Sequence, residues 1–174
     1  QIIMDDAGPA SIILKLFLLF ILILINAFFA MSEIAIISLN DAKMEKMAED
    51  GDKKAKQVLK LTKNSSNFLS TIQIGVTLAG FLTSAVAAQN FAVMLTDALA
   101  KTSVVKVIPV GAISVISTIL ITLVMSYFSL VLGELAPKKF AMQKSEKISF
   151  AVTPILLGFS KITKPFVKLL SAST

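Results

Sequence analysis

The stretch VIPVGAISVISTILITLVMSYFSLVLGELAPK, residues 107 to 138, decides how this chain folds. From Val107 to Gly133 it holds no charged residue, which is enough helix to cross about 30 Å of hydrocarbon. Glu134 closes the run, and Pro137 follows three positions later. A charged side chain costs roughly 2.5 to 3.5 kcal/mol at the centre of a membrane helix, so a carboxylate at the edge of a span is a candidate for binding something.

Pro137 strengthens this interpretation of Glu134. Proline donates no backbone hydrogen bond, and in a helix its ring crowds the carbonyl four residues back, here that of Gly133. The segment therefore places a freed carbonyl oxygen beside a carboxylate, and both are hard oxygen donors of the kind that Mg2+ or Ca2+ prefers. The alternative is an interfacial glutamate with a proline that ends the helix at the membrane edge.

Composition identifies an all-α membrane protein. The chain has 174 residues, 55% of them hydrophobic, with a mean hydropathy of +0.81. Three segments reach spanning length, at residues 10–39, 67–96 and 107–133. The first is too long for a cleavable signal sequence, and we expect the chain to be the membrane part of a longer protein.

The absence of cysteine and histidine narrows the chemistry. Zinc and copper sites usually need these residues, so any ion handled here should meet oxygen atoms. The usual catalytic base and nucleophile are also missing, and we expect no enzyme. An intramembrane enzyme that uses a carboxylate or a serine is the weakest of the alternatives.

The charges predict orientation. Of the net +6, residues 40–66 hold seven lysines and residues 134–174 another seven, whereas the loop at 97–106 holds two. The positive-inside rule then places the N-terminus outside and the C-terminus in the cytoplasm of a plasma-membrane protein with three crossings. Nucleic-acid binding is a poor alternative, because the lysines flank membrane spans and the first cluster also carries five acids.

Two further helices are expected outside the spans. An amphipathic helix at about 42–63, interrupted by Gly51 and capped by Asn40 or Asp41, should lie at the cytoplasmic surface, where its lysines reach lipid headgroups. A kinked juxtamembrane helix is expected at about 139–170, because its uncharged run is short and contains Pro154.

The second and third spans carry polar residues along one face. Gly80, Ser84 and Ala88 form a ladder of small residues, which predicts close helix packing. A stripe of serines and threonines in the third span leads to Glu134, but hydroxyls in membrane helices often bond only to their own backbone. The three antiparallel spans together bring oxygen donors to a similar depth. These are Asn26, Ser32, Glu33, Ser70, Thr71, Gln73, Gly133 and Glu134.

Three motifs carry a resemblance to a known family. They are NAFFAMSEIA at 26–35, LSTIQIGVTL at 69–78 and LGELAPK at 132–138. In this order they resemble the transmembrane domain of the CNNM/CorC magnesium transport proteins. The resemblance implies a homodimer in the lipid membrane, with three membrane helices and a juxtamembrane helix in each subunit. It also implies cytoplasmic CBS domains in the full-length protein, and this chain has no such region.

The resemblance further implies sodium-dependent Mg2+ export, with Mg2+ as the transported ion and Na+ as the coupling ion. Carried over by motif, the metal-binding positions are Ser32, Ser70, Gly133 and Glu134. Asn26, Glu33, Thr71 and Gln73 are expected to support them, and Pro137 to supply the helix break. The rival hypothesis is a membrane anchor and dimerisation module that regulates another Mg2+ transporter, in which Glu134 pairs with Lys138 or Lys139.

Overall fold

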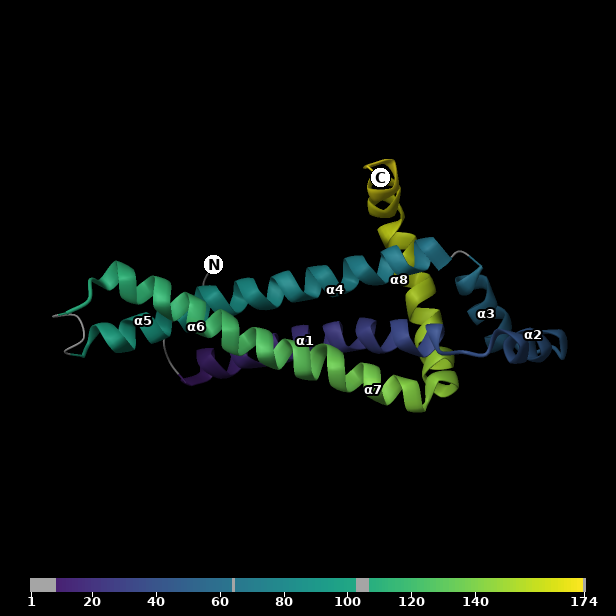
Figure 1. The fold of residues 1–174 in the computed structure, drawn as a ribbon, viewed down its shortest axis with the longest axis horizontal. Helices are drawn as coiled ribbons and strands as arrows, with labels where there is room; N and C mark the ends of the chain where they lie inside the picture. Colours follow the sequence, from purple (N-terminus) through teal and green to yellow (C-terminus); the bar gives the residue numbers. More distant parts are fainter. Residues whose placement is uncertain (1–8, 64, 103–106, 174) are drawn as a thin grey trace.

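The computed structural model describes residues 9–63, 65–102 and 107–173, and every regular element in these ranges is helical (Figure 1). Residues 103–106, part of the loop expected at 97–106, lie outside the described residues. The elements in chain order are α1 (Pro9–Ile37), α2 (Asp41–Glu49), α3 (Lys53–Thr62), α4 (Ser65–Ala87), η1 (Ala88–Ala92), α5 (Val93–Ala100), α6 (Val110–Leu130), η3 (Val131–Leu135), α7 (Ala136–Gln143) and α8 (Ser145–Ser173).

Three long helical runs lie side by side and form the body of the molecule (Figure 1). They are α1, the continuous run α4–η1–α5, and the continuous run α6–η3–α7, where η1 and η3 are short π-helical segments. These runs correspond to the three predicted spans. By length and composition a fourth helix, at Ser145–Val167, also qualifies as a candidate membrane span. The expected all-helical structure with long apolar candidate membrane spans is thus confirmed for the described residues.

The third run differs from the prediction at its end. It was expected to end near Gly133, but the helix continues to Gln143. In η3 the Ala136 N–H bonds to the Val131 carbonyl five residues back, as in a π-helix. Pro137 then falls in the first turn of α7, where a missing N–H costs least. The wide turn of η3 accommodates Pro137, so the helix does not end at this proline.

The connection between the first two runs is two helices, where one interrupted helix was expected. Gly51 separates α2 from α3 with a φ of 96°, a backbone conformation that favours glycine. Asn40 caps α2 as predicted, its side chain accepting a hydrogen bond from the Lys43 N–H at 3.0 Å. Asp52 caps α3 through bonds from two backbone N–H groups.

The expected juxtamembrane helix begins after a break at Lys144 and continues through both of its prolines as α8. In Figure 1 it runs across the three long helices, near one end of the bundle. The main hydrophobic core lies at this junction, where α1, α3, α4, α7 and α8 meet. Its buried members are Phe29, Ala35, Ile36, Leu61, Phe68, Ile72, Ala141, Ile148, Val152 and Leu156.

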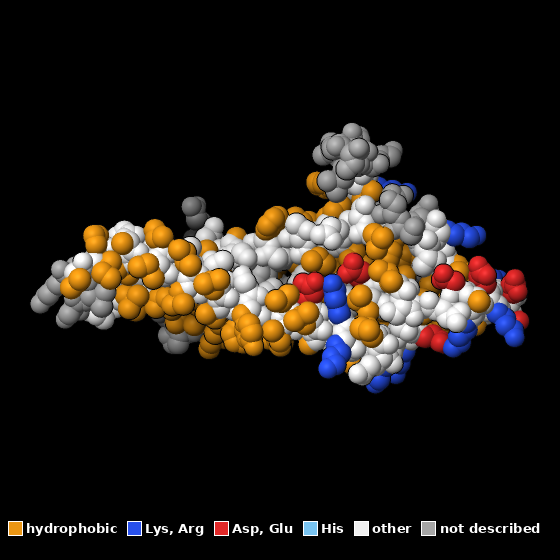
Figure 2. Space-filling model, viewed as in Figure 1, with side chains coloured by type: hydrophobic (Ala, Val, Ile, Leu, Met, Phe, Trp, Pro, Cys, Tyr) orange, Lys and Arg blue, Asp and Glu red, His pale blue; other side chains and the backbone are white. Residues whose placement is uncertain are grey.

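Large apolar side chains cover the outside of the long helices, as lipid contact requires. Figure 2 shows them along the bundle, while the lysines and acids on this face gather at the end that carries α2, α3 and α7. Examples from three helices are Phe17, Phe81 and Leu123, which are 59%, 70% and 64% exposed. The surface is therefore apolar over the shafts and charged at one end.

Candidate ion-binding site

A close crossing of α1 and η3 builds the centre of the candidate site. Gly133 is buried, and a Cβ added there would lie 2.9 Å from Nδ2 of Asn26 and 3.5 Å from the carbonyl oxygen of Ile23. Glycine is therefore the residue that allows α1 to approach the wide turn. This contact fixes the depth of Glu134, the next residue, relative to Asn26.

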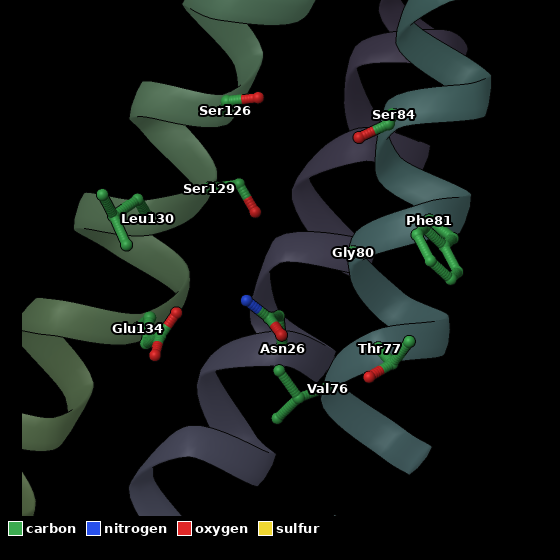
Figure 3. A pocket seen from close by; sticks show the side chains of 10 residues that line it. All are labelled: Asn26, Val76, Thr77, Gly80, Phe81, Ser84, Ser126, Ser129, Leu130 and Glu134. Carbon is green, nitrogen blue, oxygen red and sulfur yellow. The ribbon is translucent and has the colours of Figure 1, made fainter. Parts of the chain in front are cut away.

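Beside this crossing lies a cavity of about 460 Å³ between α1, α4 and α6, which we call the serine cavity (Figure 3). Most of its polar wall consists of hydroxyl groups, and Glu134 is its single charged residue. In Figure 3 the side chains of Ser129 and Glu134 point from one wall toward Asn26. The cavity is lined by Asn26, Val76, Thr77, Gly80, Phe81, Ser84, Ser126, Ser129, Leu130 and Glu134.

Asn26 is the most deeply buried polar residue of this cavity. The residue is 5% exposed, and its Oδ1 atom has no hydrogen-bond partner. An unpaired buried amide oxygen costs about 1–3 kcal/mol, so such atoms usually meet a water, an ion or a ligand. Asn26 therefore places a buried amide on the wall opposite Glu134, with its Nδ2 atom on the side of Gly133.

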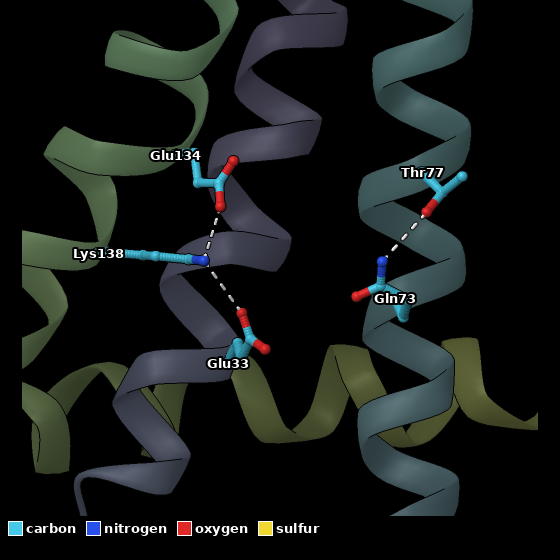
Figure 4. A network of polar contacts seen from close by, with 5 residues as sticks. All are labelled: Glu33, Gln73, Thr77, Glu134 and Lys138. Atoms are coloured by element: carbon cyan, nitrogen blue, oxygen red, sulfur yellow. Dashed lines mark hydrogen bonds and ion pairs between the residues drawn. The ribbon is translucent and has the colours of Figure 1, made fainter.

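Glu134 belongs to an ion-pair network that joins two helical runs (Figure 4). Nζ of Lys138 donates to Oε1 of Glu134 at 2.8 Å and lies 3.4 Å from Oε2 of Glu33 on α1. The three side chains are partly buried, at 28%, 34% and 27% exposure for Lys138, Glu134 and Glu33. Partial burial and two partners make this network stronger than an isolated surface pair.

A second cavity of about 650 Å³, which we call the glutamine cavity, lies between α1 and α4. It is lined by Glu33, Leu69, Ser70, Gln73, Ile74, Thr77 and Leu78. Nε2 of Gln73 donates to Oγ1 of Thr77 at 3.5 Å, and Thr77 also lines the serine cavity. The two cavities therefore adjoin at Thr77, with one glutamate of the network in each wall.

Two of the predicted side-chain donors lie outside both cavity linings. Ser32 is fully buried, and its hydroxyl donates to the Phe28 carbonyl at 2.6 Å. Thr71 is buried against α8, where the Thr163 hydroxyl lies 3.5 Å from its own and donates to it. Neither hydroxyl therefore faces the two cavities in this structure.

The structure thus brings together only part of the predicted constellation. Asn26 and Glu134 line the serine cavity and Gly133 packs against Asn26 beside it, whereas Ser70 and Gln73 line the glutamine cavity with Glu33. The roles of these residues in ion binding stay predictions, as does a free Gly133 carbonyl. Lys138 was expected beside Glu134 only by the anchor hypothesis, and its spacing of four residues was the signal.

Within the single chain, the close helix packing predicted at Gly80 does not occur. A Cβ added at Gly80 would meet nothing within 4 Å, because this residue faces the serine cavity. The close approach of α4 to α1 occurs instead at Gly75, where a Cβ would lie 2.6 Å from the ring of Phe29. Gly75 was present in the quoted motif, but its spacing from Gly80 gave no reason to prefer it.

The donor set favours a hard cation held with few charges. Among the residues that the structure describes, no three histidine, cysteine, aspartate or glutamate side chains form a metal-binding group. A cation here would meet one or two carboxylates, an amide oxygen and hydroxyls. Mg2+ sheds water reluctantly, so such a set would leave part of its hydration shell in place.

Comparison with known proteins gives an independent result. A family model described as the cyclin M (CNNM) transmembrane N-terminal domain matches residues 17–174. A UPF0053 protein of Synechocystis is 40% identical over 167 residues, which are 95% of this chain and 36% of that protein. The UPF0053 protein YugS of Bacillus subtilis is 31% identical over 162 residues, 93% of this chain and 37% of its own length.

A shorter match concerns a relative with a named activity. The polyamine export protein of Salmonella typhimurium is 34% identical over 68 residues, which are 39% of this chain and 15% of that protein. The chain spans about a third of the length of the two longer-matching relatives.

Proposed function

The chain belongs to the family of CNNM transmembrane domains, and on that premise we propose that it transports Mg2+ across the membrane. The observation that carries the proposal is the serine cavity: a carboxylate, the buried amide of Asn26 and several hydroxyls line one space between three apolar helices. Such groups are expensive in hydrocarbon unless they serve an ion or water.

We propose three membrane crossings, formed by α1, by α4–η1–α5 and by α6–η3–α7. In Figure 1, α8 runs across the three long helices, which supports its assignment as a juxtamembrane helix; by length and composition it also qualifies as a fourth candidate span. The lysines of α2, α3 and α7 lie at one end of the bundle, and the positive-inside rule makes that end cytoplasmic. The glutamine cavity then lies nearer the cytoplasm than the serine cavity.

In this proposal Glu134 supplies charge, while Asn26 and nearby hydroxyls supply neutral oxygens. Ser32 and Ser70, the positions that the family motif contributes, join the site when the helices shift during transport. Alternating exposure of the cavity to the two sides would move the ion outward, with Na+ as the coupling ion. We also propose a homodimer and, in the full-length protein, cytoplasmic CBS domains.

Mg2+ flux from liposomes tests this function against the anchor hypothesis. We expect liposomes that contain the purified chain to take up or release Mg2+ well above protein-free liposomes, and the rate to change when a Na+ gradient is imposed. A Mg2+-sensitive dye in the lumen measures the rate. Flux at the protein-free level would favour the anchor, whose Glu134–Lys138 pair is present. Flux without any Na+ response would remove the coupling from the proposal.

A polyamine is the second candidate cargo, and a specific observation favours it. The ammonium group of Lys138 pairs with the carboxylates of Glu33 and Glu134, so these carboxylates already bind one alkylammonium group. A polyamine would present the same group to the same oxygens. The name of the Salmonella relative points to the same class of cargo.

Thermal stabilisation by each cation in turn distinguishes Mg2+ from a polyamine as the cargo. If Mg2+ is the cargo, we expect Mg2+ to raise the unfolding temperature of the purified chain at concentrations where spermidine does not. Stabilisation by spermidine that Glu33→Gln abolishes, together with no response to Mg2+, would favour polyamine export. A parallel titration with NaCl at matched ionic strength controls for screening of the charged end.

A further inference from the structure

Lys138 lies between two carboxylates that come from different helical runs (Figure 4). Its Nζ atom is 2.8 Å from Oε1 of Glu134 and 3.4 Å from Oε2 of Glu33. We propose that Lys138 is a tethered counter-cation of Glu134, which the transported cation must displace in order to bind. The inference rests on the proposed function, because it takes Glu134 as the carboxylate that meets the cargo.

The geometry makes Lys138 a competitor of the cation for Glu134. Mg2+ binds carboxylate oxygens at about 2.0–2.1 Å and needs nearly octahedral space around it. The ammonium group of Lys138 already lies within hydrogen-bond distance of the same carboxylate. A lysine and a divalent ion on one carboxylate would repel each other at close range, in surroundings that are only partly exposed. Cation binding to Glu134 and the Lys138–Glu134 bond therefore compete.

Lys138 also has an alternative ion-pair partner. Its four-carbon side chain is flexible, and Glu33 is already its second partner. A small swing of Nζ away from Glu134 keeps the ammonium group paired with Glu33 on α1. The network thus offers Lys138 two alternative partners across the helix crossing, and only one of them competes with the ion.

This exchange has a consequence for transport. Glu33, Glu134 and Lys138 together carry one net negative charge, which attracts a cation more weakly than two free carboxylates would. When the cation leaves, Lys138 can return to Glu134 and neutralise it. The lysine therefore lowers the affinity of the site and favours release, which a transporter needs in each cycle.

Removal of the lysine charge tests the proposal. We expect Lys138→Met, which keeps an unbranched side chain and removes the charge, to bind Mg2+ about three- to tenfold more tightly than the natural chain, as measured by calorimetry in detergent. Its flux at saturating Mg2+ should fall, because release becomes slower. A residue with a purely structural role would not show tighter binding when it is removed. Lys139→Met, at the exposed neighbouring lysine, is the matched control and should leave the affinity unchanged.

The charge-preserving variant gives a second test that does not depend on the stability of Lys138→Met. Arginine forms stronger, forked contacts with carboxylates, so Lys138→Arg should bind Mg2+ equally or more weakly than the natural chain. Unchanged or weaker binding in Lys138→Met, or tighter binding in Lys138→Arg, would overturn the proposal. If Glu134→Gln still binds Mg2+, the proposed function itself has failed. If Glu134→Gln loses Mg2+ binding but Lys138→Met binds Mg2+ with the affinity of the natural chain, only the displacement proposal is refuted.

Discussion

Glu134→Gln should abolish the response of this chain to Mg2+. The substitution keeps the shape of the side chain and removes the single charge in the lining of the serine cavity. Changes to groups that merely support metal ligands typically cost 10–100-fold in affinity, so loss of the charged ligand should cost about 100-fold or more. Thermal stabilisation of the purified chain by millimolar Mg2+ should then disappear, and liposome flux should fall to background.

A matched substitution separates this effect from the loss of an ion pair. Glu146 on α8 also pairs with a lysine, Lys43, but it lies outside both cavities. Glu146→Gln should retain Mg2+ stabilisation and flux. An undiminished Mg2+ response in Glu134→Gln would refute the site. Equal losses in both variants would point to general weakening of the fold.

The helical architecture could be predicted because a membrane imposes strong constraints on composition. Uncharged runs of spanning length, flanked by lysines, leave few structures other than helices that satisfy their own backbone. The capping of α2 by Asn40 followed from local chemistry in the same way. These features depend on residues close together in the sequence.

The features that were missed depend on contacts between distant segments. Pro137 predicts a disturbed helix, but whether the chain stops or widens into a π-turn is decided by what the following residues pack against. Ala141 and the start of α8 enter the main core, which favours continuation. Likewise, the fourth candidate span arises because α8 packs as one long helix in spite of Pro154 and Pro165.

The candidate site was predictable in its residue types and only partly in its grouping. Their helical spacing of three and four residues predicts one shared face for Ser70, Gln73, Thr77, Gly80 and Ser84. The structure divides this face between two adjoining cavities. The division depends on the angle at which α4 crosses α1. Small residues on α4 allow the close approach of α4 to α1, but the sequence alone does not identify which small residue lies at the contact.

Gly75 and Gly80 provide a direct test of that contact. We expect Gly75→Ala to destabilise the chain by about 1–3 kcal/mol, because a Cβ at this position would lie 2.6 Å from the Phe29 ring. The ring cannot yield easily: Phe29 is 6% exposed and packs against Phe28 and Phe159 with centroid distances of 5.4 and 4.9 Å. Relief of the clash would move α4 away from α1 and widen the crossing beside both cavities.

Gly80→Ala, one and a half turns further along the same helix, is the control. A Cβ there meets nothing within 4 Å, so the added methyl group should be neutral, or stabilising by up to about 1 kcal/mol through helix propensity. Unfolding of both variants in the same detergent, followed by circular dichroism against denaturant, measures the difference. Because both substitutions are glycine to alanine within α4, composition and hydropathy change identically, and only the neighbours differ. Equal stability of the two variants would mean that Phe29 does not pack against Gly75, and the α1–α4 crossing described here would be incorrect.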